Sequence, residues 1–179
     1  MLTDWVLIGR LARELSERLR GARVQDAGML PDGRTALLVR HRGKQMLVVI
    51  DLFSSPPMVT VEHSELGVNE EPGFVRALAR SLKGMALIEV SSRRHDRLLR
   101  LRFATRSRFG VGDELDLYLE LVPRFGNMIL VKGEIVVAAS KEFTPAENTR
   151  RAILAGSSYA LPPLPEHVRT IGAESSEIT

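Results

Sequence analysis

Residues 97–104 read RLLRLRFA, and residues 115–121 read LDLYLEL. From residue 99 onward in the first stretch, and throughout the second, leucine or phenylalanine occupies every second position. A period of two is typical of a β-strand that buries one face and exposes the other. Arginines lie between the apolar residues of the first stretch, and Asp116, Tyr118 and Glu120 lie between those of the second. Both strands are therefore expected to carry a polar outer face.

Outward from these two strands, strand-like runs alternate with turn sequences. The turn sequences include PDGR at residues 31–34, HRGK at residues 41–44 and the pair Lys132-Gly133. The run MLVVI at residues 46–50 has no polar alternation, so we expect it to be covered on both faces. The expected strands are residues 22–29, 35–41, 45–52, 58–62, 86–92, 97–104, 115–121, 127–132 and 134–139.

Two segments, residues 3–20 and 72–83, show helical periodicity instead. The apolar residues that share one face are Ile8, Leu11, Ala12, Leu15 and Leu19 in the first segment, and Phe74, Leu78 and Leu82 in the second. Gly21 and Gly84 follow the two segments, at the position where helices commonly end. The order helix, four strands, helix, five strands predicts an α+β domain, namely an antiparallel β-sandwich flanked by helices.

The composition is that of one globular domain of 179 residues and 19.9 kDa. The chain contains no cysteine, which excludes disulfides, thiolate nucleophiles, zinc fingers and iron–sulfur clusters. No stretch approaches the roughly 18 apolar residues of a membrane-spanning helix, and the N-terminal charges do not fit a signal peptide. We therefore expect a cytoplasmic protein with a domain at residues 1–164 and a linker or disordered tail at residues 165–179.

The net charge of +3 conceals a strongly basic segment at residues 76–108, which holds ten basic and two acidic side chains. Such a segment is expected to form a face that binds a polyanion. The arginines expected along one rim of this face are Arg93, Arg94, Arg97, Arg100 and Arg102. The alternative is that these charges lie on solvated elements and bind nothing.

The motifs of common enzyme classes do not occur. The four histidines, His41, His63, His95 and His167, share no metal-ligand spacing, and HExxH, GxSxG and the P-loop are absent from the sequence. Gly110-Val111-Gly112 is a bare GxG that a turn explains better than a phosphate cradle. We therefore expect no enzymatic activity, no metal and no cofactor.

Several short motifs follow one another between residues 1 and 164. They comprise Asp4, Glu14, Leu15, Leu19 and Gly21; Phe74, Leu78, Leu82 and Gly84; Asp96 and Arg97; Glu120, Leu121, Arg124, Asn127, Ile129, Leu130 and Val131; and Arg151, Ile153, Leu154, Gly156, Tyr159, Pro162 and Pro163. In this order and at these spacings they resemble the N-terminal domain of the NFACT proteins. That family includes the bacterial ribosome quality control factor RqcH, its eukaryotic counterpart NEMF and bacterial chains called fibronectin-binding protein A.

The resemblance implies a fold similar to the N-terminal domain of the formamidopyrimidine DNA glycosylases, with a different activity. RqcH-like proteins bind peptidyl-tRNA or alanyl-tRNA on obstructed large ribosomal subunits and support the untemplated addition of alanine to the stalled chain. The implied partners are therefore tRNA and the large ribosomal subunit, with no membrane and no DNA.

In the family the Asp-Arg pair engages tRNA, so Asp96 and Arg97 are the first candidate contacts. Arg97 lies two residues before Leu99, and such residues point to the same side of a strand. We therefore expect the Arg97 side chain to begin on the inward side and to need a buried acceptor or an RNA phosphate. A structural pairing of Arg97 with a neighbouring carboxylate is the alternative. The other candidates for tRNA contact are Arg94, Arg100 and Arg124. Arg124 could equally be a simple exposed loop arginine. The motif residues expected to have a structural role are Asn127, Arg151, Gly156 and Tyr159.

Three positions depart from the family pattern. The usual Asp-Gly near the start is Asp4-Trp5, the basic tract of the second helix is Ala79-Arg80-Ser81, and the His-Ser pair before Asn127 is Phe125-Gly126. The second departure weakens a nucleic-acid role for that helix.

Three other functions compete with tRNA binding. A DNA glycosylase of the related fold would need an N-terminal proline followed by glutamate, where this chain has Leu2 and Thr3. A fibronectin-binding adhesin would need a signal or anchor sequence, which we do not find. An interaction domain with no nucleic-acid role is the third alternative.

Overall fold

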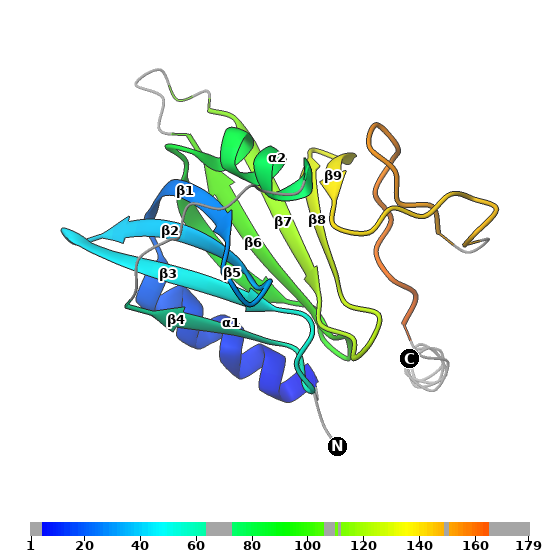
Figure 1. The fold of residues 1–179 in the computed structure, drawn as a ribbon, viewed down its shortest axis with the longest axis horizontal. Coiled ribbons are helices and arrows are strands. Elements are labelled where there is room, and N and C mark those ends of the chain that lie inside the picture. Colours follow the sequence, from blue (N-terminus) through cyan, green and yellow to red (C-terminus); the bar gives the residue numbers. More distant parts are fainter. Residues whose placement is uncertain (1–4, 64–72, 106–109, 111, 149–150, 165–179) are drawn as a thin grey trace, which may run out of the picture.

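The computed structural model describes residues 5–63, 73–105, 110, 112–148 and 151–164 (Figure 1). The tail at residues 165–179 lies outside the described residues, as do the first residues of both expected helices. In chain order the elements are α1 (Trp5–Leu19), β1 (Arg23–Met29), β2 (Thr35–His41), β3 (Lys44–Asp51), β4 (Met58–Glu62), α2 (Gly73–Leu82), β5 (Ala86–Ser92), β6 (Leu98–Ala104), β7 (Glu114–Glu120), β8 (Asn127–Lys132) and β9 (Ile135–Ala139). This order confirms the expected α+β class.

Helix α1 forms because its apolar residues recur at helical spacing. Ile8, Ala12, Leu15 and Leu19 are buried, as the sequence predicts. On the exposed side Glu14 and Arg18 form an ion pair at 3.5 Å. Gly21 follows the helix with a φ of 89°, a left-handed conformation that glycine adopts without steric cost, so the chain turns there into β1.

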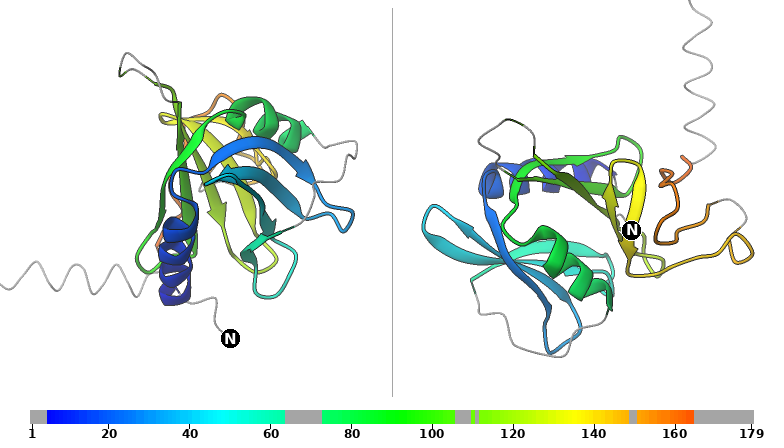
Figure 2. Two further views of the ribbon diagram at one scale, coloured as in Figure 1. Left: turned by 90° about the vertical axis from the view of Figure 1, so that its left-hand side faces the viewer. Right: turned by 90° about the horizontal axis from the view of Figure 1, so that it is seen from above.

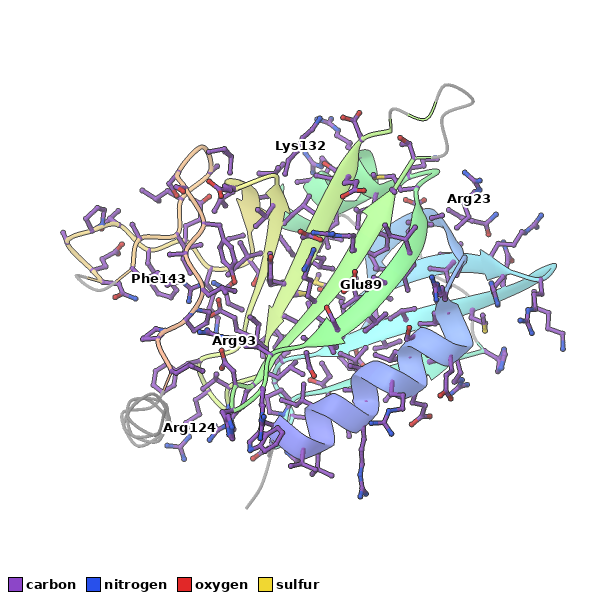
Figure 3. All side chains as sticks on the ribbon, turned by 180° about the vertical axis from the view of Figure 1, so that it is seen from behind. Arg23, Glu89, Arg93, Arg124, Lys132 and Phe143 are labelled. Atoms are coloured by element: carbon purple, nitrogen blue, oxygen red, sulfur yellow. The ribbon has the colours of Figure 1, made fainter. Side chains whose placement is uncertain are left out.

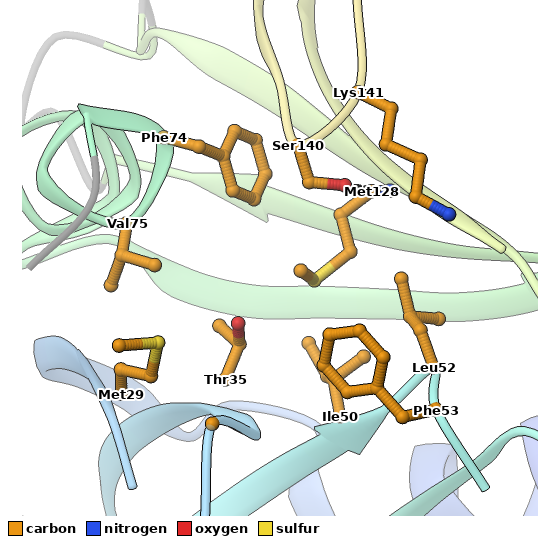
Figure 4. Close-up of a pocket in the computed structure, with 11 residues that line it drawn as sticks. Met29, Thr35, Ile50, Leu52, Phe53, Phe74, Val75, Met128, Ser140 and Lys141 are labelled. Atoms are coloured by element: carbon orange, nitrogen blue, oxygen red, sulfur yellow. Dashed lines mark hydrogen bonds between the residues drawn. The ribbon is translucent and has the colours of Figure 1, made fainter.

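Helix α2 buries a slightly different stripe from the predicted one. Its buried residues are Val75, Leu78 and Leu82, whereas Phe74 is half-buried. Phe74 lies at the edge of the helical stripe, which is centred on Val75, Leu78 and Leu82. Its ring lines an apolar cavity of about 180 Å³ between the start of α2 and the end of β3, together with Met128 (Figure 4).

Among the described residues the strands form one antiparallel sheet in the order β4-β3-β2-β1-β5-β6-β7-β8-β9. Most neighbouring strands pair over several residues. Strands β1 and β5 are joined by the single pair Arg23↔Ala86. The sheet therefore consists of two halves, β1–β4 and β5–β9, with a short connection between them.

The two layers of the expected sandwich are the two halves of one continuous sheet, which folds so that these halves face each other (Figure 2). Residues of both halves and of both helices belong to one buried cluster, which includes Val48, Leu87, Leu101, Leu117 and Leu130. Helix α1 packs against β5 and β6, and α2 packs against β1 and β9 on the opposite side. The similarity to the glycosylase domain stays a prediction.

The two halves differ on their outer faces. Strand β3 is covered on both sides, as predicted, because Leu47 and Val49 join a separate cluster with Leu30 and Ala36. Between Leu99 and Phe103 in β6, and throughout β7, the outer positions are polar, as their alternation predicts. Residues 151–164, which we call the C-terminal arm, lie beside the outer face of β7–β9 (Figure 3). Their contacts include Ile153 in a small apolar cluster with Ile129.

Candidate nucleic-acid interface

Two loops that carry predicted site residues meet at one end of the second half of the sheet. The β5–β6 loop is residues 93–97 and the β7–β8 loop is residues 121–126. The backbone N–H of Leu121 donates to the carbonyl of Arg97 at 2.8 Å, which fixes the loops side by side. The loops therefore bring Arg94, Arg97 and Arg124 to the same end of the domain. Figure 3 labels one residue of each loop there, Arg93 and Arg124.

The start of α1 joins this end through Trp5. The ring centroids of Trp5 and His95 are 4.6 Å apart, and the guanidinium carbon of Arg94 lies 5.9 Å from the centre of the Trp5 ring. The second contact is a cation–π interaction. We call the surface formed by Trp5, Arg94, His95, Arg97 and Arg124 the tip surface.

Asp96 stabilises the turn from which Arg97 projects. Its carboxylate accepts the backbone N–H of Arg97 at 2.7 Å and Nη1 of Arg93 at 3.2 Å. Because these bonds hold Arg97 in the turn, pairing in β6 begins one residue later, at Leu98↔Glu120. The predicted inward orientation of Arg97 is therefore wrong: the residue is exposed, and it forms no ion pair within the described part of the chain.

Two residues of the tip surface adopt left-handed backbone conformations. His95 has a φ of 60° and Arg124 a φ of 67°. Such conformations are uncommon for arginine and less so for histidine, and they often occur at binding sites. Arg124 is exposed in its turn. Its geometry fits either a ligand contact or the exposed loop arginine that the sequence left as an alternative.

The predicted rim of five arginines does not form, because carboxylates from the neighbouring strand and from the β5–β6 loop bind several of them. Nε of Arg100 and Nε of Arg102 each lie 3.0 Å from Oδ1 of Asp116, and this contact raises the pKa of Arg102. Arg93 is bound to Asp96 and to the carbonyl of Pro162. Arg100 is therefore part of the outer face of the sheet and not of the tip surface.

Exposed aromatic side chains lie next to the tip surface. Phe125 in the β7–β8 loop is 76% exposed, and Phe53 after β3 is 79% exposed. A Cβ at Gly126 would lie 3.2 Å from the Cβ of Leu52, so the loops that carry the two phenylalanines touch. Phe53 was not identified from the sequence. The signal available there was a single aromatic residue between a buried strand and the Ser-Ser-Pro-Pro stretch.

Asn127 joins β8 to the chain that follows β9. It is 1% exposed; its Nδ2 donates to the carbonyl of Lys141 at 2.9 Å, and its Oδ1 accepts Oγ–H of Ser140 and N–H of Lys141. This geometry fits the structural role expected of Asn127, because the protein itself occupies three of the four hydrogen-bonding positions of this buried amide.

The other motif residues dock the C-terminal arm. Arg151 forms a buried ion pair with Glu120, the two side chains being 9% and 11% exposed, and its guanidinium carbon lies 5.2 Å from the centre of the Tyr159 ring. Tyr159 stacks on Tyr118 at 4.5 Å, and burial raises the pKa of its hydroxyl. Gly156 has a φ of 85°, and its N–H donates to Val136 at 2.8 Å.

Among the described residues no group of histidine, aspartate and glutamate side chains is arranged to hold a metal ion. In the same residues no helix is long and apolar enough to cross a membrane.

The sequence profile described as "NFACT N-terminal and middle domains" matches residues 4–179. The chain belongs to the NFACT family. Two proteins named Rqc2 homolog RqcH are similar to this NFACT chain. The protein from Bacillus subtilis (strain 168) is 24% identical over 183 residues, which cover 99% of this chain and 32% of the relative. The protein from Streptococcus suis (strain 05ZYH33) is 24% identical over 166 residues, which cover 91% and 30%. The chain thus spans about a third of the curated relatives it matches.

Solved structures share the fold of this NFACT chain. The N-terminal part of the fibronectin/fibrinogen-binding protein from Streptococcus suis aligns with a TM-score of 0.81 at 23% identity, covering 92% of this chain and 62% of that chain. The N-terminal domain of the fibronectin-binding protein PavA from Streptococcus pneumoniae aligns with a TM-score of 0.78 at 17% identity, covering 98% and 70%. At these identities the similarity shows the fold.

Proposed function

We propose that this NFACT domain is the tRNA-binding N-terminal module of an RqcH-like ribosome quality control factor. In this role it would engage peptidyl-tRNA or alanyl-tRNA on the large ribosomal subunit and support the untemplated addition of alanine to a stalled chain. The domain itself would bind RNA without catalysing a reaction, and it would act in the cytoplasm. The observation that carries the proposal is the tip surface, where exposed arginines lie beside exposed aromatic rings.

The arginines of the tip surface suit RNA phosphates. Arg97 and Arg124 are exposed and form no ion pair within the described residues, so their guanidinium groups are available to a ligand. A guanidinium group presents a planar fork that matches two phosphate oxygens. Asp96 would act as a positioning residue, because its carboxylate already binds the turn and Arg93.

The neighbouring phenylalanines suit unpaired bases. Sequence-specific and non-specific RNA-binding proteins both stack splayed bases on exposed aromatic side chains, at about 1–3 kcal/mol per base. Phe53 and Phe125 are the most exposed large apolar residues of the described chain, and both lie on loops next to Arg124. The tip surface would therefore bind a segment of tRNA in which nucleotides are unpaired.

The test compares two arginines with the same local geometry. Arg124 and Arg42 are both exposed turn residues with positive φ, 67° and 49°, but Arg42 lies in the β2–β3 turn of the other half. Arg124→Asn and Arg97→Ala should each weaken tRNA binding by about 1–3 kcal/mol, the scale of charge-assisted contacts. Arg42→Asn should leave the affinity unchanged. Fluorescence anisotropy with labelled tRNA measures these affinities.

Salt dependence provides a second readout. Each phosphate contact contributes about 0.7–0.9 to the slope of log affinity against log salt, so each tip variant should lower the slope by that amount. Equal affinities for the three variants and the wild type would contradict the proposal. In that case, binding of immobilised fibronectin by the same proteins would favour the adhesin alternative.

A further inference from the structure

The outer face of the second half carries a cavity that the tip surface does not include. Its volume is about 200 Å³, and it is lined by Ser91, Arg93, Leu98, Arg100, Tyr118 and Leu161, among others. We propose that this cavity binds a phosphate group. The proposal concerns a site behind the β5–β6 loop and does not require the tip surface to bind RNA.

The floor of the cavity follows from the register of three strands. Ser91 of β5 pairs with Arg100 of β6, and Arg100 pairs with Tyr118 of β7. Directly paired residues project from the same face of a sheet, with Cβ atoms about 5 Å apart. A hydroxyl, a guanidinium group and a phenol ring therefore form one row on the outer face. Arg93 borders the cavity from the loop, and Leu161 borders it from the C-terminal arm.

The hydrogen bonds of Arg100 leave part of its guanidinium group without an acceptor. Nε of Arg100 is bound to Asp116, which also binds Arg102. Nη2 of Arg100 is buried and has no hydrogen-bond partner within the described part of the chain. A buried donor without a partner loses roughly 1–3 kcal/mol relative to a satisfied one, so native proteins seldom retain it without a ligand, an ion or a water.

One of the unsatisfied buried polar atoms belongs to a residue that lines this cavity. For the described residues, the buried side-chain nitrogen and oxygen atoms that lack a partner are Arg100 Nη2, Arg151 Nε and Tyr159 OH. Arg100 is the cross-strand neighbour of Tyr118, and Tyr159 stacks on Tyr118. The Arg151 guanidinium group lies against the Tyr159 ring. Arg100 thus lines the cavity itself, whereas Arg151 and Tyr159 belong to the neighbouring stack of the C-terminal arm on Tyr118.

The chemistry of these groups selects an anion with several oxygens. Guanidinium groups donate hydrogen bonds and accept none, and a hydroxyl at Ser91 can donate as well. Arg93 and Arg100 border the cavity from a loop and from a strand, so an acceptor that reaches both must offer oxygens in different directions, as a tetrahedral phosphate does. A liquid water occupies about 30 Å³, so the cavity has room for a phosphate group and some water. Leu98 and Leu161 lower the local polarity and strengthen such contacts.

A phosphate group could come from an RNA strand or from a free phosphate. An RNA strand bound to the tip surface would lie near the cavity, because Arg93 borders the cavity and binds Asp96, the neighbour of Arg97. An RNA strand on the tip surface could place a backbone phosphate there. The chemistry of the site is the same for both sources, and the experiment separates them.

The first arm titrates the protein with inorganic phosphate at constant ionic strength and follows arginine Nε–H resonances by NMR. We expect saturable binding that Arg100→Gln weakens about tenfold or more, the loss of one charge-assisted hydrogen bond. Arg102→Gln is the matched control, because Arg102 lies on the same strand and face and binds the same Oδ1 at the same 3.0 Å, but does not line the cavity. It should bind phosphate like the wild type.

A second variant keeps the test independent of the arginine–Asp116 contacts. Ser91→Leu fills the floor of the cavity without changing any charge, and it should abolish phosphate binding while the thermal melting temperature stays close to that of the wild type. Absence of saturable binding to the wild type would overturn the proposal. Equal losses in Arg100→Gln and Arg102→Gln would also overturn it, because they would show an unspecific response to charge.

The second arm asks which source supplies the phosphate. If an RNA backbone occupies the cavity, inorganic phosphate should weaken tRNA binding to the wild type but not to Ser91→Leu. If phosphate binds at Arg100 and leaves the tRNA affinity unchanged, the ligand is a free phosphate and the site still stands. Failure of the proposed function is distinguishable, because it would remove the effect of Arg97→Ala on tRNA and leave phosphate binding intact.

Discussion

The two halves of the sheet differ in how much of their outer faces is apolar. In the first half Ala36, Leu47 and Val49 form a second buried apolar layer, so both faces of β3 contribute to stability. In the second half the outer positions of β6 and β7 are arginine, aspartate, tyrosine and glutamate, except for Leu98 and Ala104 at the two ends of β6. Apolar burial on this outer face is largely confined to β8, β9 and the C-terminal arm, where Ile129 and Val131 pack with Ile153. The comparison shows that one half serves as scaffold, while the other combines scaffold with candidate binding sites.

The largest expected effect tests the part of the second half that the C-terminal arm covers. Arg151→Met leaves Glu120, whose side chain is only 11% exposed, without its cation. Removing one partner of a buried ion pair costs about 3–5 kcal/mol of the free energy of unfolding. Urea denaturation measures the loss, and the double variant Glu120→Gln with Arg151→Met should recover part of it. A loss as small as that of an exposed ion pair would show that the arm does not bury the pair.

The next effect compares the outer faces directly. Leu47→Ala removes a fully buried side chain from the apolar layer of the first half and should cost about 2–5 kcal/mol. Arg102→Ala alters the outer face of the second half, where the arginine side chain is 33% exposed. It should cost at most about 1 kcal/mol, because Asp116 keeps its ion pair with Arg100. The same denaturation experiment measures both. Similar losses would remove the distinction between the two faces.

A smaller effect concerns alkaline pH. Burial raises the pKa of Tyr159 in the folded protein, whereas an unfolded tyrosine titrates near pH 10. The folded state therefore holds this proton more tightly, and the resulting stability is present below about pH 10 and is lost as the pH rises above it. Melting temperatures should fall less steeply above about pH 10 in Tyr159→Phe than in the wild type. Part of the dependence should persist, because burial also raises the pKa of Tyr118. Identical slopes would contradict the burial of the Tyr159 hydroxyl.

The smallest effect is expected at an exposed ion pair of the first half. The pKa of Asp32 is lowered by the backbone N–H of Arg34 and further by the Arg34 side chain. Its contribution to stability is therefore present above the unfolded value of about 3.9 and is lost as the pH falls below it. Asp32→Asn should lower the melting temperature slightly at neutral pH and not at all in strong acid. A difference that persists in acid would point to a cause other than charge.

The periodicity of the sequence was sufficient to predict the helices and strands and most of the buried residues. The alternation of residues 99–103 correctly separated buried Leu99, Leu101 and Phe103 from outward Arg100 and Arg102. The orientation of a side chain inside a strand depends only on its position along the strand, so neighbouring residues carry that information. Arg97 was misplaced because it precedes the strand, where a hydrogen bond to Asp96 and not the alternation sets its direction.

The candidate site required the pairing of distant segments. The sequence separates Arg100 from Asp116 by fifteen residues, and only the β6–β7 register shows that Asp116 binds both Arg100 and Arg102. In the same way, Phe53 and Phe125 become neighbours through a contact between two loops.

The sequence by itself determined the α+β class, the order of helices and strands, the polar outer face of β6 and β7 and the NFACT resemblance, because these depend on local spacing. The tertiary structure decided that the sheet is continuous and bent, which arginines remain available to a ligand, and where buried donors lack a partner. The physical reason is that charge pairing and burial depend on distances between strands and loops, and these distances exist only once the chain has folded.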